Sequence, residues 1–394
     1  MARVKNNNGV ARDVTLVHFA LMSGYRLFSL YYPLFLAAQG FSLTQIGKAY
    51  FFIYLPIALG APLAGFLTRI IHPAIMIAAG CLGYAAYALG MVFFDGAAIV
   101  YLWQIALGLS AAMFFTASRC LLMFNSDNDA ESNFSWFYNA PYWAGVIAPA
   151  LGAVIIWQFG FKAAFEISVA VCLYAAALAA GMVGYPWHKT NRDLAWKKFA
   201  TSWNRSVKLV SKGSIGALVA LSFVVAVAGS LTDPFFILFL KNNLRFDQTQ
   251  VLHFMVLSAA VFSIFYFFVL KHWQTGDPRT SIKRGALGSG VFTVVLGLLV
   301  PVLSYASAFA VQFARGIGEF LTGTGRSSLL TRELRGHPSE AGALDTVFSP
   351  LSIALGSFAG GYLVEWMGYQ NLFIFAGGAI LVAVFAVNFL NGKK

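Results

Sequence analysis

The chain has 394 residues, of which 59% are hydrophobic and only 11% are charged, and its mean hydropathy is +0.72. This composition excludes a soluble globular protein of this length. Apolar runs of about 20 residues, the length that a helix needs to cross a hydrocarbon core, recur from end to end. The net charge of +12 suggests a nucleic-acid partner. The basic residues lie in short loops between apolar runs, however, and this distribution is typical of a membrane protein. We therefore expect the lipid bilayer, and no nucleic acid, as a partner.

Twelve apolar segments predict an all-α polytopic membrane protein with twelve transmembrane helices. The basic residues predict its orientation, because cytoplasmic loops carry an excess of lysine and arginine. With the N-terminus inside, the outer loops carry few basic residues, chiefly Lys162, Lys241 and Arg245. We therefore expect a multi-pass protein of a bacterial or archaeal plasma membrane with both termini in the cytoplasm. The predicted spans are 14–38, 46–68, 73–94, 98–122, 134–157, 162–184, 214–240, 249–270, 284–303, 306–330, 342–364 and 370–390.

One long basic loop, residues 185–213, separates the sixth and seventh spans. Within it, apolar residues recur at helical spacing with lysines and arginines between them. This pattern is typical of an amphipathic helix that lies on an anionic membrane surface. The alternative is a solvated linker helix, and neither interpretation makes the loop a functional site. The apolar residues are Trp196, Phe199, Trp203, Val207 and Val210.

The cysteines and histidines predict neither disulfides nor a metal site. Cys81, Cys120 and Cys172 all lie within apolar segments, where cysteine packs as a small hydrophobic residue. The six histidines are scattered without the spacing of a metal site. No phosphate-binding loop is present, so ATP is not expected as the direct energy source. We therefore expect no cofactor.

The two halves of the chain repeat each other. QIALGLSAAMFFTASRCLL from 104 and QFARGIGEFLTGTGRSSLL from 312 align at an offset of 208, which also pairs Gly160 with Gly368. FSLTQI (41–46) and FDQTQV (246–251) each place a polar residue three positions before a glutamine, as in a capping box at a helix start. The expected organisation is an N-terminal six-helix half (1–184), a cytoplasmic amphipathic linker (185–213) and a C-terminal six-helix half (214–394). Such a repeat is typical of transporters.

Four stretches carry a family resemblance: PLFLAAQGFSLTQIG (33–47), APALGA (148–153), GFKAAF (160–165) and GYQNLF (368–373). With the repeat, they resemble the major facilitator superfamily over nearly the whole chain. APALGA is similar to the small-residue-and-proline motif of the family's proton antiporters. The resemblance implies a monomer in which helices one, four, seven and ten line a central cavity.

Two positions depart from the family pattern. The signature after the second span usually contains an Asp, where this chain has Thr68. The fourth span usually has an Arg, where this chain has Gln104. Both departures argue against the drug/proton antiporters that carry these residues and leave the expected fold unchanged.

The deeply placed charges lie on the helices that would line the cavity. They are Arg26 in span one, Asp233 in span seven, and Arg315 and Glu319 in span ten. A charge in the bilayer interior is costly and usually faces a cavity or a partner, so these residues mark the expected transport pathway. Arg119 lies towards the inner end of span four.

Span ten has a polar stripe in which residues step by three and four, and we expect it to face water in the cavity. Arg315 and Glu319 are four residues apart and can pair on one helix. The pair either belongs to the transport site or serves only helix packing. A buried pair rarely stabilises more than an apolar substitute would, which favours the functional interpretation. The stripe consists of Gln312, Arg315, Glu319, Thr322 and Arg326.

Roles for the charges follow from their chemistry. Burial disfavours the charged form of a carboxylate, so Asp233 and Glu319 are the candidate proton carriers. Asp233 has no cation within reach on its own helix; it either titrates freely or pairs with Arg26 of the other half as a gate. Arg26 and Arg315 could clamp an organic anion between the halves, because Arg binds carboxylates and phosphates bidentately. Alternatively, Asp233 and Glu319 neutralise both arginines.

Further site residues complete the prediction. Gln312 and Gln104 are expected in the substrate and coupling site, together with Asn139 and Tyr142 from the aromatic start of span five. The aromatic residues there could equally be packing residues. Arg119 and Pro149 are assigned to gating. Glu166, His253, Asp345 and Glu365 lie near span ends, where water is expected, and receive no role.

The leading interpretation is a secondary active transporter that works by alternating access and is coupled to protons. The resemblance of APALGA and the aromatic, apolar cavity helices favour export of amphipathic small molecules. The alternatives are a proton-coupled carrier of an organic anion held by Arg26 and Arg315, and a lipid flippase on the same fold. The sequence contains no catalytic grouping of serine, histidine and aspartate, so an enzyme is not expected.

Overall fold

The computed structural model describes most of the chain. The described backbone covers 7–93, 96–124, 130–187, 213–265, 277–334 and 338–392, with 189, 197, 200–201, 203–204, 207–208 and 211 between. The predicted amphipathic linker therefore lies mostly outside the described residues.

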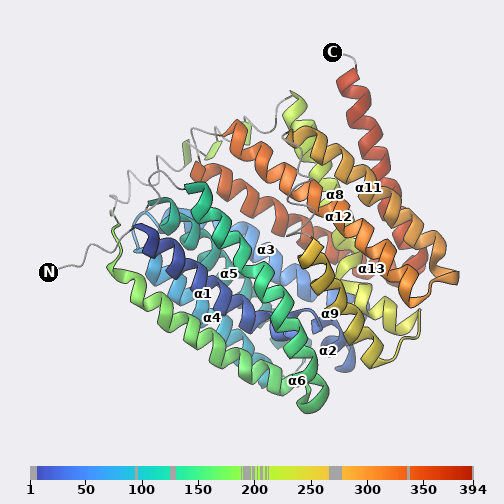
Figure 1. The fold of residues 1–394 in the computed structure, drawn as a ribbon, viewed down its shortest axis with the longest axis horizontal. Coiled ribbons are helices and arrows are strands. Elements are labelled where there is room, and N and C mark those ends of the chain that lie inside the picture. Colours follow the sequence, from blue (N-terminus) through green and yellow to red (C-terminus); the bar gives the residue numbers. More distant parts are fainter. Residues whose placement is uncertain are drawn as a thin grey trace. The chain divides into compact units, whose positions relative to one another are not determined.

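The described elements are all helical (Figure 1). The first group is α1 (Asn7–Ser29), α2 (Tyr32–Ala38), α3 (Leu43–Leu67), α4 (Pro73–Val92), α5 (Ala97–Phe124) and α6 (Ala130–Ala180), followed by a 3₁₀ turn (Gly181–Gly184). The second group is α8 (Gly213–Asn242), α9 (Gln248–Phe265), α11 (Pro278–Leu299) with a 3₁₀ turn (Val300–Val302), α12 (Tyr305–Glu333) and α13 (Pro338–Gly392).

Two of these elements, α6 and α13, each contain two helices. Gly160 interrupts α6 with φ of 79°, and Gly368 interrupts α13 with φ of 76°. Glycine populates positive φ without the steric penalty of a Cβ atom, so both positions favour glycine. The two glycines are the pair that the offset of 208 predicted. With these breaks, the described helices are consistent with twelve spans.

The first predicted span is not one continuous helix, which corrects the expectation. α1 ends at Ser29 and α2 begins at Tyr32. Pro33 has no N–H to donate to the carbonyl of Ser29, four residues earlier, so the hydrogen-bond ladder is interrupted there, and Pro33 lies instead in the first turn of α2, where no such bond is needed. The helix ends instead with a turn in which the Tyr31 N–H donates to the Phe28 carbonyl, three residues earlier, at 2.9 Å.

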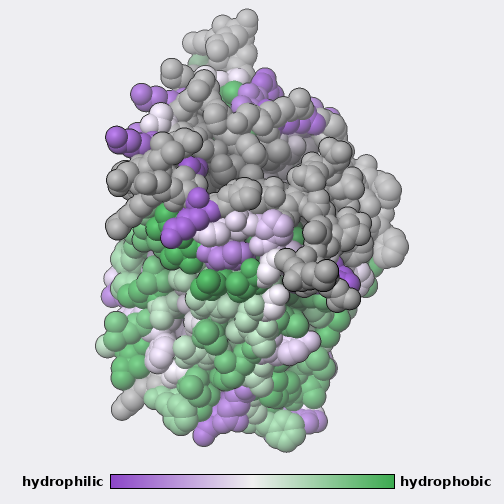
Figure 2. Space-filling model, turned by 90° about the vertical axis from the view of Figure 1, so that its left-hand side faces the viewer, coloured by the Kyte–Doolittle hydropathy of each residue, from purple (hydrophilic) through white to green (hydrophobic). Residues whose placement is uncertain are grey.

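Eight described segments are long and apolar enough to cross a membrane, and two of them, Trp143–Gly184 and Thr346–Phe389, are long enough for two crossings. α1 and α12 are not among the eight, and both belong to the spans that carry deep charges. Large apolar side chains such as Trp157, Trp366 and Phe385 are exposed. Figure 2 shows one face, on whose lower part hydrophobic residues predominate. Such a surface suits contact with lipid.

The chain packs as two compact units. The first comprises Met1–Tyr32 and Leu55–Thr201, and the second comprises Pro33–Tyr54 and Ser202–Lys394. In the first unit α1 packs along α6, and α4 packs against α5 and α6. In the second unit α8 packs along α13, and α11 packs against α12 and α13. The helix α3 contributes its first half to the second unit and its remainder to the first.

The repeat extends to the closest helix contacts. A Cβ atom added at Gly152 of α6 would overlap the carbonyl oxygen of Leu27 in α1. A Cβ atom added at Gly360 of α13 would overlap the carbonyl oxygen of Leu231 in α8. Gly152 and Gly360 are again related by the offset of 208. Small residues let two backbones approach closely, and both units use the same device.

Both predicted capping boxes are confirmed. At the start of α3, the Ser42 N–H donates to the Gln45 side chain at 2.9 Å, and the Gln45 N–H donates to the Ser42 hydroxyl at 3.2 Å. At the start of α9, Asp247 and Gln250 make the same exchange at 3.0 and 2.7 Å. These bonds satisfy N–H groups that have no partner within the helix.

Candidate functional site

The candidate site lies in the second unit, where α8 and α12 contact each other. α12 begins at a capping box formed by Ser304 and Ser307, and it carries the predicted polar stripe. Asp233 in α8 is followed by Pro234, which cannot donate a hydrogen bond to the carbonyl of Ser230. The position of Asp233 on α8 brings its carboxylate to α12.

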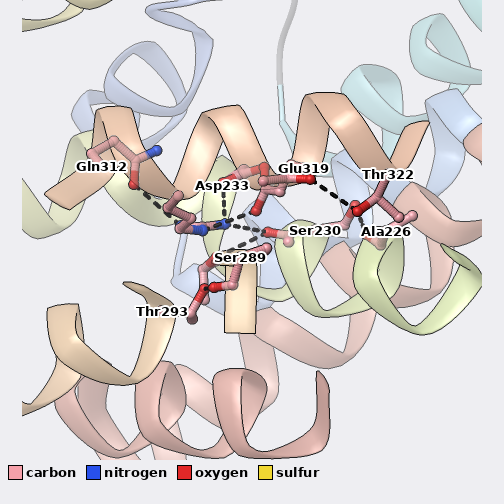
Figure 3. A network of polar contacts seen from close by, with 12 residues as sticks. Ala226, Ser230, Asp233, Ser289, Thr293, Gln312, Glu319 and Thr322 are labelled. Carbon is pink, nitrogen blue, oxygen red and sulfur yellow. Dashed lines mark hydrogen bonds and ion pairs between the residues drawn. The ribbon is translucent and has the colours of Figure 1, made fainter. Parts of the chain in front are cut away.

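Arg315 of α12 is the centre of the site. Figure 3 labels its side-chain partners Gln312, Asp233 and Glu319. Its Nη2 donates to Asp233 Oδ1 at 2.6 Å, and its Nε donates to Glu319 Oε1 at 2.9 Å. Its Nη1 donates to Gln312 Oε1 at 3.3 Å, and Nη2 also donates to the carbonyl of Gly229 at 3.4 Å. The pairing of Arg315 with Glu319 confirms the prediction from their spacing. The guanidinium thus joins two carboxylates on two helices.

The three charged side chains differ sharply in exposure. The side chain of Arg315 is fully buried, whereas those of Asp233 and Glu319 are 47% and 27% exposed. The expectation that the polar stripe faces water is therefore wrong for Arg315, and also for Thr322 and Arg326, which are buried. A buried guanidinium needs several acceptors, and the inward position provides them from two helices. The carboxylates remain the accessible part of the site.

The formal charges of these side chains do not balance. One guanidinium faces two carboxylates, so the group has a net charge of −1 when all three side chains are ionised. Binding of one proton makes it neutral. We call Asp233, Arg315 and Glu319 the acidic triad.

Gly229 borders the triad, and sequence reasoning missed it. A Cβ atom added there would lie 3.0 Å from Glu319 Oε1 and 3.6 Å from Asp233 Oδ2. Its carbonyl accepts from Arg315 and from the hydroxyl of Thr232, the latter at 2.9 Å. Glycine at this position leaves space between the two carboxylates. One glycine in an apolar helix gives no signal of such a role.

The other predicted site residues lie in the first unit. Arg26 in α1 packs against Gly145, where an added Cβ atom would lie 3.0 Å from Nη1. Arg119 in α5 is half-buried. The structure therefore places Arg26 and Arg119 in one unit and the acidic triad in the other, and the pairing of Arg26 with Asp233 stays a prediction. The side chains of Asn139 and Tyr142 lie outside the described residues.

Gln104 and Pro149 belong to the core of the first unit. The fully buried Gln104 amide donates to the hydroxyls of Tyr32 and Tyr87, the latter at 3.2 Å. The carbonyl of Pro149 accepts from the Tyr31 hydroxyl at 2.9 Å. The bonds to Tyr32 and Tyr31 connect α5 and α6 to the segment around the break between α1 and α2, and the bond to Tyr87 connects α5 to α4. This geometry gives Gln104 and Pro149 a clear packing contact, and their predicted roles in coupling and gating remain predictions.

The comparisons with known proteins agree with this architecture. The sequence matches the Major Facilitator Superfamily over residues 14–349. A comparison with curated proteins finds no match. A crystal structure of the peptide transporter POT in complex with alafosfalin is similar, with a TM-score of 0.74 and 13% identity, over 98% of this chain and 94% of that chain. A crystal structure of the nucleoside transporter NupG is similar, with a TM-score of 0.76 and 14% identity, over 97% of this chain and 99% of that chain. The resemblance inferred from sequence is thereby confirmed: this multi-pass membrane protein belongs to the Major Facilitator Superfamily.

Proposed function

We propose that the protein is a proton-coupled secondary active transporter that exports amphipathic small molecules by alternating access. The family and the fold indicate a transporter and not an enzyme. The observation that carries the coupling proposal is the acidic triad, in which Asp233 and Glu319 share the single guanidinium of Arg315. Net charge within a membrane is costly, so a group that becomes neutral with one proton is suited to carry that proton between the two sides.

The proton is a better coupling ion for this site than a metal cation. The Arg315 guanidinium lies 2.6 Å from Asp233 and 2.9 Å from Glu319. A sodium ion on either carboxylate would be placed beside this fixed positive charge and would be repelled by it. A proton removes the charge of a carboxylate without adding a separate cation. The exposed Asp233 side chain gives the proton its access.

The same geometry favours a neutral or cationic substrate over an organic anion. All three nitrogens of the Arg315 guanidinium donate to protein oxygens, and the side chain is fully buried. An anion would meet the exposed carboxylate oxygens instead. We therefore rank the anion carrier that would use Arg26 and Arg315 second. No described feature favours the lipid flippase.

A thermal-shift screen of the purified protein in detergent tests this proposal. The ligands are organic anions on one plate and lipophilic cations or neutral amphiphiles on another, each at acidic and alkaline pH. We expect amphiphiles to stabilise the wild type and the Arg26→Ala variant. The pH dependence of this stabilisation should be lost in Asp233→Asn and Glu319→Gln.

The matched control is Glu333→Gln, because Glu333 is a carboxylate of the same helix that pairs with Arg279 outside the triad, at 3.7 Å. This variant should keep the wild-type pH dependence. Stabilisation by anions that disappears in Arg26→Ala or Arg315→Ala would replace the exporter with an anion carrier. A pH dependence that survives both carboxylate substitutions would remove the triad as the proton site.

A further inference from the structure

The start of α3 is held by a carboxylate from α13. Glu365 Oε1 accepts from the backbone N–H of Thr44 at 2.8 Å, and Oε2 accepts from the Thr44 hydroxyl at 2.6 Å. The first turn of a helix has N–H groups without intrahelical partners and a partial positive charge, so a carboxylate binds there favourably. The capping box of Ser42 and Gln45 occupies the same turn. Glu365 thus adds a capping group from another helix.

This bond lies at the end of a close contact between the two helices. A Cβ atom added at Gly47 would overlap the carbonyl oxygen of Ser357, and one added at Gly361 would lie 2.6 Å from the Leu43 carbonyl oxygen. Further along, the rings of Phe51 and Phe358 have centroids 5.1 Å apart. Small residues allow this approach of backbones. The first half of α3 is therefore firmly packed on α13.

Among the described residues, the repeat-related pair cannot form an equivalent bond. The offset of 205 between the capping boxes relates Thr44 to Thr249, and the offset of 208 relates Glu365 to Trp157. The indole of Trp157 can only donate a hydrogen bond, so it cannot replace the carboxylate as an acceptor. The contact between Thr44 and Glu365 is therefore particular to α3 and α13 and is not a feature of the repeat.

α3 is also the helix that passes from one unit to the other. Its residues up to Tyr54 belong to the second unit, and those from Leu55 belong to the first. Pro56 lies inside the helix directly after this boundary. It cannot donate to the carbonyl of Phe52, and such a missing bond is a common site of helix bending.

We propose that Glu365 is a gating residue. The Thr44–Glu365 contact holds the first half of α3 on α13 in one state of the transport cycle. When the contact breaks, the first half of α3 moves away from α13, and α3 bends near Pro56. The contact lies at the helix ends that the distribution of basic residues predicts to be outside the cell. The contact requires neither the acidic triad nor a particular substrate, so it is a separate element of the transport mechanism.

Distances between two spin labels, measured by double electron–electron resonance, test this proposal. Spin labels are attached to Gln39→Cys, next to α3, and Gln370→Cys, in α13, in a background without the native cysteines. Both positions are exposed. The distances are measured at one pH, without substrate, in proteins that retain Asp233 and Glu319. The outcome therefore does not depend on whether the acidic triad is the proton site. We expect Glu365→Gln or Thr44→Val to increase the population at long distance about fivefold, because a charge-assisted hydrogen bond is lost.

Two control variants accompany this measurement. Thr249→Val makes the same change at the repeat-related position and should leave the distances unchanged, and Thr44→Ser retains the hydroxyl and should resemble the wild type. Unchanged distances in both Glu365→Gln and Thr44→Val would overturn the proposal. An equal shift in Thr249→Val would also overturn it.

Glu365→Asp decides the question if Glu365→Gln and Thr44→Val do not fold. This variant keeps the carboxylate but shortens the side chain by one methylene group, which weakens its bonds to the N–H and the hydroxyl of Thr44. We expect the long-distance population to increase in Glu365→Asp, while Thr44→Ser stays at the wild-type level. Wild-type distances in Glu365→Asp would show that the contact does not control the gate.

Discussion

Arg315 contributes to stability mainly because its positive charge neutralises the carboxylates of Asp233 and Glu319. Removing one partner of a buried ion pair leaves the other charge without compensation, whereas replacing the whole group by neutral residues often costs little. In the acidic triad, loss of Arg315 would leave Asp233 and Glu319 facing each other with no positive charge between them. Stability and charge balance are therefore linked at this residue.

We predict that Arg315→Met lowers the free energy of unfolding by about 3 kcal/mol. This value is at the lower end of the range for broken buried pairs, because both carboxylates are partly exposed and retain some solvation. The measurement is the unfolding midpoint in detergent. Adding Asp233→Asn and Glu319→Gln to Arg315→Met should recover most of the loss. A triple variant that is less stable than Arg315→Met alone would contradict this account.

Part of this site was predictable from sequence. The deep charges on spans seven and ten stand out in apolar segments, and the spacing of Arg315 and Glu319 determines that they share a helix face. Neutralisation of the arginines by Asp233 and Glu319 was an open alternative, but the bond from Arg315 to Asp233 could not be singled out, because periodicity describes one helix and gives no register between two. The inward position of Arg315 escaped prediction for the same reason, since its acceptors come from α8 as well as α12.

At the scale of elements, the two units depend on the same pair of close helix contacts. Gly152 brings α6 to α1, and Gly360 brings α13 to α8. Neither site has room for a methyl group, because the opposing atom is a backbone carbonyl oxygen and not a side chain that could rotate. These glycines thus determine how closely the two helices of each pair can pack.

We predict that Gly152→Ala and Gly360→Ala each destabilise the protein by about 1–3 kcal/mol, the usual cost of overpacking. Thermal unfolding in detergent measures this. Gly378→Ala in α13 is the control, because an added Cβ atom there meets nothing within 4 Å. It should be neutral or stabilising by roughly 0.5–1 kcal/mol, since alanine favours helix over glycine. Equal effects at all three positions would argue against close packing as the cause.

Helix positions were mostly predictable, and the exceptions have local causes. The apolar runs and capping boxes predicted where α3 and α9 begin. The break after α1 was missed, because the apolar run continues through Pro33 and hydropathy does not report a missing N–H. Glu365 was given no role because it lies near a span end, where water is expected. Its partner, Thr44, is distant in sequence and becomes evident only in the folded chain.

For the whole molecule, the distribution of basic residues predicts both termini in the cytoplasm. We predict that Lys241→Cys reacts with a membrane-impermeant maleimide in intact cells, and that Arg279→Cys reacts only after permeabilisation. Both positions are exposed, and the native Cys81 and Cys172 are buried, which limits background labelling. The wild type measures the background that remains. Labelling of Arg279→Cys in intact cells, with protection of Lys241→Cys, would reverse the orientation.

The division of α3 between two units has a consequence for cutting the chain. Cleavage at a protease site inserted into 185–213 would give two fragments. The cut in the sequence would not coincide with the division of the structure into two units. The N-terminal fragment would still contain Pro33–Tyr54, which packs within the second unit. The fragments should therefore remain together on a sizing column after the peptide bond is cut, much as a domain-swapped segment binds two chains. Such a result would show that the two fragments stay associated without covalent continuity through the long loop.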